Sequence, residues 1–529
     1  MAELPLAIVG VGIAVPALGQ FVVSLGKAAL DRVGHSDDEY WRKVKLIIET
    51  AKLQTQDILQ YLDRLGENAP EVFLENMDDL FQVVRNILER LLPLLPTSKP
   101  GAKSAENTNF SAQQKKKINK AVSDIEQWNV RLLYRAMSFR FFTDQQAPNT
   151  PRLSNSPTEC VPTPLKRVEW LRESVASSLD RAKNESKLLV KDFKERTSLH
   201  QLRESTLWLV TPCAGGQSFL MEYRRYSDDA HESHIQRQRE IVRDIAGILR
   251  QADPAFMGLL YCDGFLDDPL QCRFALRFPI PGGFRNPRTL LDLLTDPDNK
   301  SGTMHPLDHR IALAKSIVTA VFVLHSANLV HKQIRPDNIV IFEDSPTIEL
   351  STVGTQGNLT NEKRGYPYSL GKPFIVGFDN VRKADAASLM VVEKDWKKNL
   401  YLDPARHRLQ EGDEFQMQHD LYSLGVVLLE IAFWSSFQNK DARLIGRKIW
   451  KDTSQKEMKG PESLKKTYIS LAKAVPVTMG QKYADIVMLC ITGLESAGDG
   501  LKRLEDEDGI TVKIRYILEI ISKIEEINL

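Results

Sequence analysis

The chain has 529 residues, enough for about two to four domains at roughly 150 residues each. Apolar residues make up 42% of it, a globular composition that excludes wholesale disorder. Its 70 basic and 69 acidic residues leave a net charge of +1, which argues against a chain built to coat nucleic acid, so we expect no nucleic-acid partner.

The N-terminal segment between Glu3 and Lys27 carries no charged residue. As a helix it would span about 35 Å, enough to cross a hydrocarbon core of about 30 Å. Its prolines, glycines and Gln20 make it a weak transmembrane segment. Three interpretations stay open: a helix that is buried at rest and enters a membrane on release, which we favour, a permanently buried core helix, and a constitutive anchor.

Two sets of residues in this segment are candidates for function. Gly12, Gly19 and Gly26 recur every seven residues, so a helix would carry one smooth face for close packing against another helix. The candidate membrane-inserting residues are Leu4, Leu6, Ile8, Val9, Val11, Ile13, Val15, Leu18, Phe21, Val22 and Leu25. Because Glu3 stands in place of a basic n-region, we do not expect a cleaved secretory signal.

Helical spacing of apolar residues then continues to about residue 200 and predicts an all-α bundle. Three stripes fall in residues 41–65, 73–91 and 118–139, a fourth in 168–193, and the charged stretch 183–199 is expected to be a final long helix. Residues 93–117 and 143–164 are expected to be exposed loops. The lysine triplet at 115–117 suits either a solvated helix face or contact with anionic lipid.

Short β-like runs appear from about residue 205, and the stretch LVHKQIRPDNIVIF at 329–342 resembles the catalytic loop of protein kinases. His331, Lys332 and Gln333 stand where kinases have His-Arg-Asp, and Asn338 follows at the spacing of the metal-binding Asn. Further matches are PFIVGFDNVR at 373–382, YLDPAR at 401–406 and HDLYSLGVVLLEIAFW at 419–434, whose Asp420 is expected to tie down the loop. The resemblance implies an α+β, bilobal kinase-like fold over residues 202–529.

The departures from the kinase pattern argue against catalysis. Gln333 replaces the catalytic Asp, and an amide cannot accept a proton at neutral pH. Gly377 replaces the first residue of Asp-Phe-Gly, and Asp379 lies two residues later. Asp337 is expected to have no catalytic role. We therefore expect a pseudokinase without phosphoryl transfer.

Nucleotide binding is also expected to be weak. The chain has no G-x-G-x-x-G, and Arg224 stands near the position of the kinase lysine, with Glu240 as its candidate partner. Asn338 suits either an ion or a structural bridge between backbone groups. Residues 343–372 are expected to form an exposed insertion. The five cysteines lack metal-ligand spacing, so we expect a reduced intracellular protein with no metal and no cofactor.

Taken together, residues 1–200 resemble the fungal HeLo and HeLo-like domains, and the whole arrangement is similar to the mixed-lineage kinase-domain-like proteins of necroptosis. The resemblance implies an effector of regulated cell death or of fungal heterokaryon incompatibility. It implies a protein that is cytoplasmic at rest, self-associates and permeabilises the plasma membrane. The upstream signal would come from an NLR-like receptor or a kinase.

Two other functions remain open from the sequence. An atypical active kinase would use Asp379 as its metal ligand and would bind nucleotide with magnesium. A non-catalytic scaffold would keep the first helix in the core and would leave vesicles intact. The uncharged N-terminal run favours the membrane effector.

Overall fold

The fold is that of a computed structural model, which describes residues 6–34, 38–65, 71–96, 111–143, 164–176, 188–190, 197–203, 205–213, 215–296, 305–344, 369–378, 382–383, 395–408, 417–438, 460–493 and 519–527. The chain divides into two units, Met1–Arg167 and Val168–Leu529. The first contains helices only, and the second contains antiparallel sheets and helices, as the sequence predicts at this level. The boundary lies well before the predicted position near residue 200.

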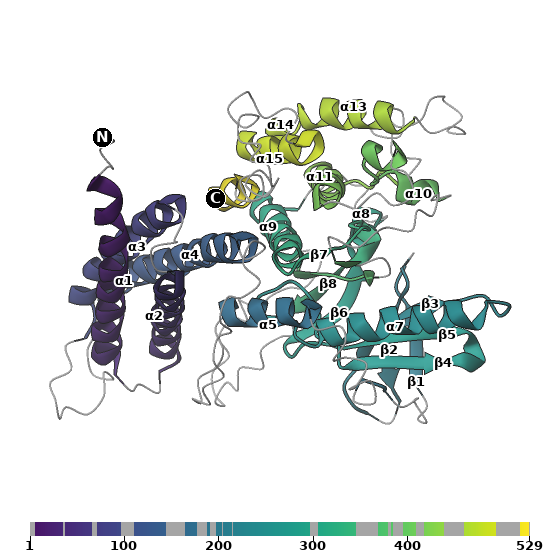
Figure 1. The fold of residues 1–529 in the computed structure, drawn as a ribbon, viewed down its shortest axis with the longest axis horizontal. Coiled ribbons are helices and arrows are strands. Elements are labelled where there is room, and N and C mark those ends of the chain that lie inside the picture. Colours follow the sequence, from purple (N-terminus) through teal and green to yellow (C-terminus); the bar gives the residue numbers. More distant parts are fainter. Residues whose placement is uncertain are drawn as a thin grey trace, which may run out of the picture. The chain divides into compact units, whose positions relative to one another are not determined.

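Four long helices form the first unit. They are α1 (Leu6–Val33), α2 (Glu39–Leu65), α3 (Glu71–Leu91) and α4 (Ala112–Thr143), with a short 3-10 turn, η2 (Leu92–Leu94), after α3. Helix α1 packs against α2 and α3, and α4 packs against the same two helices (Figure 1). Because the apolar stripes of α2 and α3 repeat every three to four residues, each presents one continuous face to its neighbours.

The predicted apolar stripes are confirmed in this unit. Trp41, Val44, Ile47 and Ile58 of α2 are buried. The stripe of α3 is buried at Met77, Leu80, Val84, Ile87 and Leu91. Polar cross-links supplement them: Gln54 in α2 donates to the backbone carbonyl of Asn129 in α4 at 3.0 Å. The lysines at 115–117 are not in a loop, because α4 already begins at Ala112, and they lie exposed on its first turns.

Close packing around α1 depends on its glycines. A Cβ added to Gly19 would lie 2.6 Å from Leu59 Cδ2 of α2 and 3.0 Å from Phe81 Cε2 of α3. A Cβ added to Gly26 would lie 3.3 Å from Lys52 Cβ. Glycine therefore lets α1 approach both neighbours more closely than a larger residue would allow.

We expect Gly19→Leu to lower the free energy of unfolding of the helical unit by about 1–3 kcal/mol, because the added side chain has no space between Leu59 and Phe81. Ala17→Leu is the matched control, since Ala17 lies exposed on the same helix. Thermal unfolding followed by helical circular dichroism measures both. Equal effects of the two variants would refute the packing role of Gly19.

The second unit begins with α5 (Pro164–Ala176), which straddles the boundary, and a five-stranded antiparallel sheet of order β1-β2-β3-β5-β4. Its strands are β1 (Thr197–Gln201), β2 (Leu207–Pro212), β3 (Phe219–Arg225), β4 (Gly264–Asp268) and β5 (Arg273–Pro279). Helix α7 (Glu232–Leu249) follows β3 and packs against β4 and β5 (Figure 1). The main chain at 188–190 pairs with Phe265 and covers the edge of β4.

The predicted final helix at 183–199 is wrong in both parts that the structure describes, because residues 188–190 pair with Phe265 of β4 and Thr197–Gln201 is strand β1. All five of its residues are at least partly exposed, so no burial pattern marks the strand in the sequence. It is held by backbone pairing with β2, from Thr197 opposite Pro212 to Gln201 opposite Trp208. Strand formation here depends on a partner elsewhere in the chain.

The remainder of the second unit is mainly helical around two small sheets. The order is β6 (Phe284–Thr289), α8 (Leu290–Leu294), α9 (Leu307–Ser326), β7 (Leu329–Val330), η8 (Pro336–Asn338), β8 (Ile339–Asp344), β9 (Lys372–Ile375), β10 (Arg382–Lys383), α10 (Trp396–Asn399), η10 (Pro404–Arg408), α11 (Met417–Phe433), α13 (Pro461–Ala472), α14 (Pro476–Met479) and α15 (Gln481–Thr492). The sheets are β6-β8-β9 and β10-β7. Helix α11 is buried along nearly its whole length and packs against α9, α13 and α15, so it forms the centre of this region.

The segment at 519–527 lies within the second unit, beside α9 and α15. Lys315 of α9 donates to the carbonyl of Ile527 at 2.9 Å, and Lys482 of α15 lies 3.1 Å from the carboxylate of Glu526. Most of the predicted insertion at 343–372 lies outside the described residues.

Candidate functional site

The loop that resembles a kinase catalytic loop is held by one buried carboxylate. Asp420 of α11 accepts hydrogen bonds from the backbone N–H groups of His331 at 2.6 Å and Lys332 at 2.7 Å, and His325 Nε2 lies 3.2 Å away. Burial alone would raise the pKa of Asp420, but the contacts with His325 and His331 outweigh it and hold that pKa below its ordinary value. Asp420 therefore ties down the loop as the sequence predicts.

The loop conformation depends on this anchor. Lys332 has φ +68°, a left-handed conformation that a non-glycine residue adopts only when its surroundings enforce it. His331 Nε2 lies 2.9 Å from the carbonyl of Val376, which joins the loop to the chain after β9. The ring of His331 also packs against Phe378.

Gln333 lies half-buried in this loop. Its backbone N–H lies 3.3 Å from His331 Nδ1, and its side-chain oxygen accepts from Arg335 at 3.4 Å. Arg335 also pairs with Asp337 at 2.9 Å, so Asp337 is engaged in an ion pair. The Gln333 amide can donate and accept hydrogen bonds but cannot take a proton from a hydroxyl at neutral pH.

Asn338 bridges backbone groups. Its Nδ2 donates to the carbonyl of Gln333 at 2.9 Å, while its own backbone carbonyl accepts from Val376 N–H at 2.9 Å. A Cβ added to Gly377, which has φ +80°, would lie 2.3 Å from Asn338 Cγ. The structure thus favours the bridging interpretation of Asn338, with its side chain packed directly against Gly377.

The sequence did not predict the role of Glu222, a fully buried residue of β3. Its carboxylate accepts hydrogen bonds from the backbone N–H groups of Gly377 at 2.9 Å and Phe378 at 3.1 Å. The backbone at 377–378 is therefore held by a carboxyl group from the sheet. Asp379, the candidate metal ligand of an atypical kinase, lies outside the described residues.

Arg224, two residues along the same strand, lies on the same face as Glu222, and its guanidinium is 3.9 Å from the Glu222 carboxylate. The predicted partner, Glu240 of α7, is exposed and accepts a hydrogen bond from Gln236 at 3.4 Å. The charged contact of Arg224 described here is thus with Glu222. The i, i+2 spacing of the two residues was the sequence signal for this pair.

The YLDPAR segment is anchored on α11 through a second buried carboxyl group, that of Glu430. One oxygen of Glu430 accepts from Tyr401 at 2.9 Å, Ser436 at 3.2 Å and the N–H of Phe437 at 2.7 Å. Its other oxygen has no hydrogen-bond partner among the described residues. Burial raises the pKa of Glu430 from its ordinary 4.5 to about 8, outweighing these hydrogen bonds.

This shift predicts a pH dependence. Between pH 4.5 and about 8 the folded state holds a proton on Glu430 that the unfolded state has released. The contribution of Glu430 to the free energy of unfolding is therefore fully present below pH 4.5 and is lost as the pH rises to about 8. The slope is at most about 1.4 kcal/mol per pH unit. Glu430→Gln should flatten it, whereas Glu462→Gln, at an exposed position, should not. Denaturant titrations from pH 5 to 8 measure both, and parallel curves for wild type and Glu430→Gln would contradict the assignment.

In the N-terminal segment the structure places some candidates in the core and others at the surface. Val15 and Val22 are buried, Leu18 and Leu25 are half-buried, and Phe21 is 46% exposed. Leu4 lies outside the described residues. The other candidates lie in α1, but their side chains are outside the described part: Leu6, Ile8, Val9, Val11, Gly12 and Ile13.

The described residues show neither a membrane-spanning helix nor a metal site. None of the helices in this part of the chain is long and apolar enough to span a bilayer. No group of three or more His, Cys, Asp or Glu side chains there is placed to hold a metal ion. The apolar start of α1, residues 6–13, falls outside the side chains that are described.

Comparison with known proteins does not identify the chain. No protein-family model matches it, and no curated protein matches it.

Proposed function

We propose that this chain is a membrane-permeabilising effector of regulated cell death, in which a catalytically inactive kinase-like domain controls an N-terminal helical bundle. The observation that carries the proposal is the packing of α1. The inward face of the uncharged part of α1, before Lys27, includes Val15, Gly19, Val22 and Gly26 and is buried where α1 packs against α2 and α3. Such a face is stored away from water and becomes available to lipid only when the bundle opens.

Several features support a bilobal kinase-like fold for the second unit. They are the sheet order β1-β2-β3-β5-β4 with α7 between β3 and β4, the loop at 331–338 after α9, and Asp420 of α11 bound to that loop. Gln333 and the Glu222 contact to Gly377 support a site without phosphoryl transfer. The protein is then a pseudokinase that needs no cofactor for its activity.

Release of α1 is a population shift in this proposal. Moving the bundle from about 1:99 to 99:1 in favour of the open state requires about 5.5 kcal/mol of differential binding. An upstream receptor or kinase acting on the second unit supplies part of this, and self-association supplies the rest. The protein is cytoplasmic at rest and at the plasma membrane once active.

Expression in yeast tests the proposal. The full chain and a variant lacking residues 1–30 are expressed at equal levels, and viability and uptake of a membrane-impermeant dye are measured. We expect dye uptake and lost viability to require residues 1–30. Identical outcomes for the two chains would remove the membrane function.

The main competing function is a non-catalytic scaffold that keeps α1 permanently in the bundle. The close packing of Gly19 and Gly26 agrees with the scaffold equally well, because a tightly packed helix can either leave the bundle on a signal or stay there permanently. The two functions differ in whether α1 leaves α2, and that difference can be tested directly.

A further inference from the structure

Strand β1 forms one edge of the five-stranded sheet, and its outer side pairs with no strand that the structure describes. The opposite edge of the sheet is closed by the chain itself. There Val190 N–H donates to the carbonyl of Phe265 at 2.9 Å, and Phe265 N–H donates to the carbonyl of Leu188 at 2.8 Å. The sheet therefore has one covered edge and one edge with open backbone groups.

The backbone groups that point outward from β1 can be assigned from its pairing with β2. Leu202 N–H donates to the carbonyl of Leu207 at 2.9 Å, so Leu202 faces β2. Because backbone groups alternate in direction along a strand, those of His200 and Ser198 face β2 as well. The N–H and C=O groups that point away from the sheet are those of Thr197, Leu199 and Gln201.

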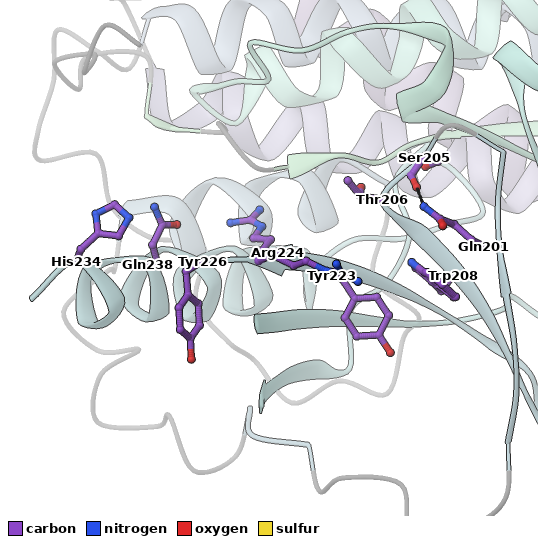
Figure 2. Close-up of a pocket in the computed structure, with 10 residues that line it drawn as sticks. Gln201, Ser205, Thr206, Trp208, Tyr223, Arg224, Tyr226, His234 and Gln238 are labelled. Atoms are coloured by element: carbon purple, nitrogen blue, oxygen red, sulfur yellow. Dashed lines mark hydrogen bonds between the residues drawn. The ribbon is translucent and has the colours of Figure 1, made fainter. Parts of the chain in front are cut away.

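Strand β1 lacks the features that commonly protect an open edge. Thr197–Gln201 contains no proline, lysine, arginine or carboxylate, and it pairs with β2 along its whole length without a bulge. The end of the strand is held in place, because Gln201 Nε2 donates to the carbonyl of Ser205 in the β1–β2 turn at 2.9 Å (Figure 2). A regular, uncharged edge of this kind can accept a further strand.

The outward groups fit a second copy of the same strand. In an antiparallel pair centred on Leu199, Leu199 lies opposite its own counterpart and Thr197 lies opposite Gln201, so the outward groups form about six hydrogen bonds. Leu199 is 53% exposed, although Val210 beside it in β2 is buried. The Leu199 side chain of the second copy would cover it on the same face of the sheet.

The charges around β1 favour a second copy over an unrelated strand. Glu195 stands four residues before Leu199 and Arg203 four residues after it, and Lys194 and Glu204 stand five residues before and after it. The antiparallel pair would place each of these four opposite a residue of opposite charge. Of the four, Arg203 alone lies among the described residues, so the others enter through their order in the sequence.

Arg203 has an existing contact that is compatible with this pairing. Its side chain is 53% exposed and lies 3.7 Å from the carboxylate of Asp292. An ion pair so open to water contributes little to stability, so Arg203 loses little on turning toward a second copy.

We propose that two copies of this chain associate through β1, as antiparallel edge strands related by a two-fold axis at Leu199. The pairing joins the two sheets into one continuous sheet and covers both exposed edges. It uses the second unit alone and stands independently of the membrane activity proposed above.

Sedimentation equilibrium of the full chain, without lipid and with reductant, tests the proposal. We expect a monomer–dimer equilibrium with a dissociation constant on the order of 10–100 µM, because the interface is small. Leu199→Pro removes an outward N–H and no bond to β2, and Leu199→Lys places two like charges at the two-fold axis. Each should weaken the dimer about tenfold or more. Leu270→Lys is the matched control, at a leucine that is 92% exposed in the 3-10 turn η6 (Pro269–Gln271), and should change it by less than about twofold.

A cross-link locates the contact. Opposed residues of a hydrogen-bonded antiparallel pair have Cα atoms about 5.5 Å apart, which is within disulfide range. Leu199→Cys should therefore give a reducible dimer on mild oxidation, whereas Leu270→Cys should give no more dimer than the wild type. Thermal unfolding by circular dichroism shows whether Leu199→Pro still folds, and if it does not, the two lysine variants decide.

Three results would overturn the proposal. They are a wild type that stays monomeric well above the expected dissociation constant, a dimer that Leu199→Lys and Leu270→Lys weaken equally, and equal cross-linking through positions 199 and 270.

Discussion

Replacing Asp420 with alanine is expected to lower the free energy of unfolding of the second unit by about 3–5 kcal/mol. Asp420 is fully buried, and its carboxylate is the acceptor for the backbone N–H groups of His331 and Lys332. Alanine would leave both donors unsatisfied inside the protein and would remove the contact that holds Lys332 in its left-handed conformation.

Chemical denaturation of the full chain, followed by the fluorescence of its tryptophans, measures this loss. Asp308→Ala is the control, because the Asp308 side chain is 64% exposed and its removal should cost less than about 0.5 kcal/mol. Asp420→Asn should fall between the two, since an amide oxygen can still accept one of the backbone hydrogen bonds. A loss for Asp420→Ala as small as that for Asp308→Ala would show that the loop does not depend on this anchor.

The helices of the first unit could be predicted from the sequence because their information is local. In α2 and α3 the apolar residues recur every three to four positions, and the same residues are buried in the fold. The start of α4 was placed too late, because the lysine run at its first turns carries no apolar residue before Ile118. A charged first turn gives no apolar periodicity, so the start of such a helix cannot be predicted from the spacing of its apolar residues.

Strand β1 could not be predicted from its own residues. Thr197–Gln201 has no buried residue, so neither alternation nor apolarity distinguishes it from an exposed helix. Its conformation comes from pairing with β2, and that partner is set by the whole sheet. The helical interpretation of 183–199 therefore extends the predicted helical region past Thr197, where strand β1 begins.

The contacts of the candidate site likewise include some that the sequence predicts and others that only the fold shows. The anchoring of the loop by Asp420 follows from motif order and spacing, which the sequence carries. The Glu222 contact with Gly377 joins a strand to a segment 155 residues away and can be read only from the fold. The sequence suggested Glu240 as the partner of Arg224. In the fold, Arg224 and Glu222 lie on the same face of β3, 3.9 Å apart, and the Glu222 carboxyl group binds the backbone at 377–378.

Release of α1 from α2 has the largest expected effect on activity, and the geometry offers a way to block it. A Cβ built on Gly26 lies 3.3 Å from Lys52 Cβ, close to the 3.5–4.5 Å separation of cysteine Cβ atoms in disulfides. A Gly26→Cys/Lys52→Cys double variant should therefore form a reducible cross-link between the two helices. In the oxidised form the disulfide holds α1 against α2. In the reduced form α1 can separate from the bundle.

The decisive measurement is dye release from anionic vesicles by residues 1–176, which end with α5 and leave out β1, comparing the oxidised and reduced forms of this double variant. Gly26→Cys and Lys52→Cys alone, under the same redox conditions, control for effects of the substitutions. The membrane-effector account predicts at least about tenfold more release from the reduced form, with no redox effect on either single variant. Equal release from the two forms, or intact vesicles in both, would contradict it and favour a scaffold whose first helix never leaves the bundle.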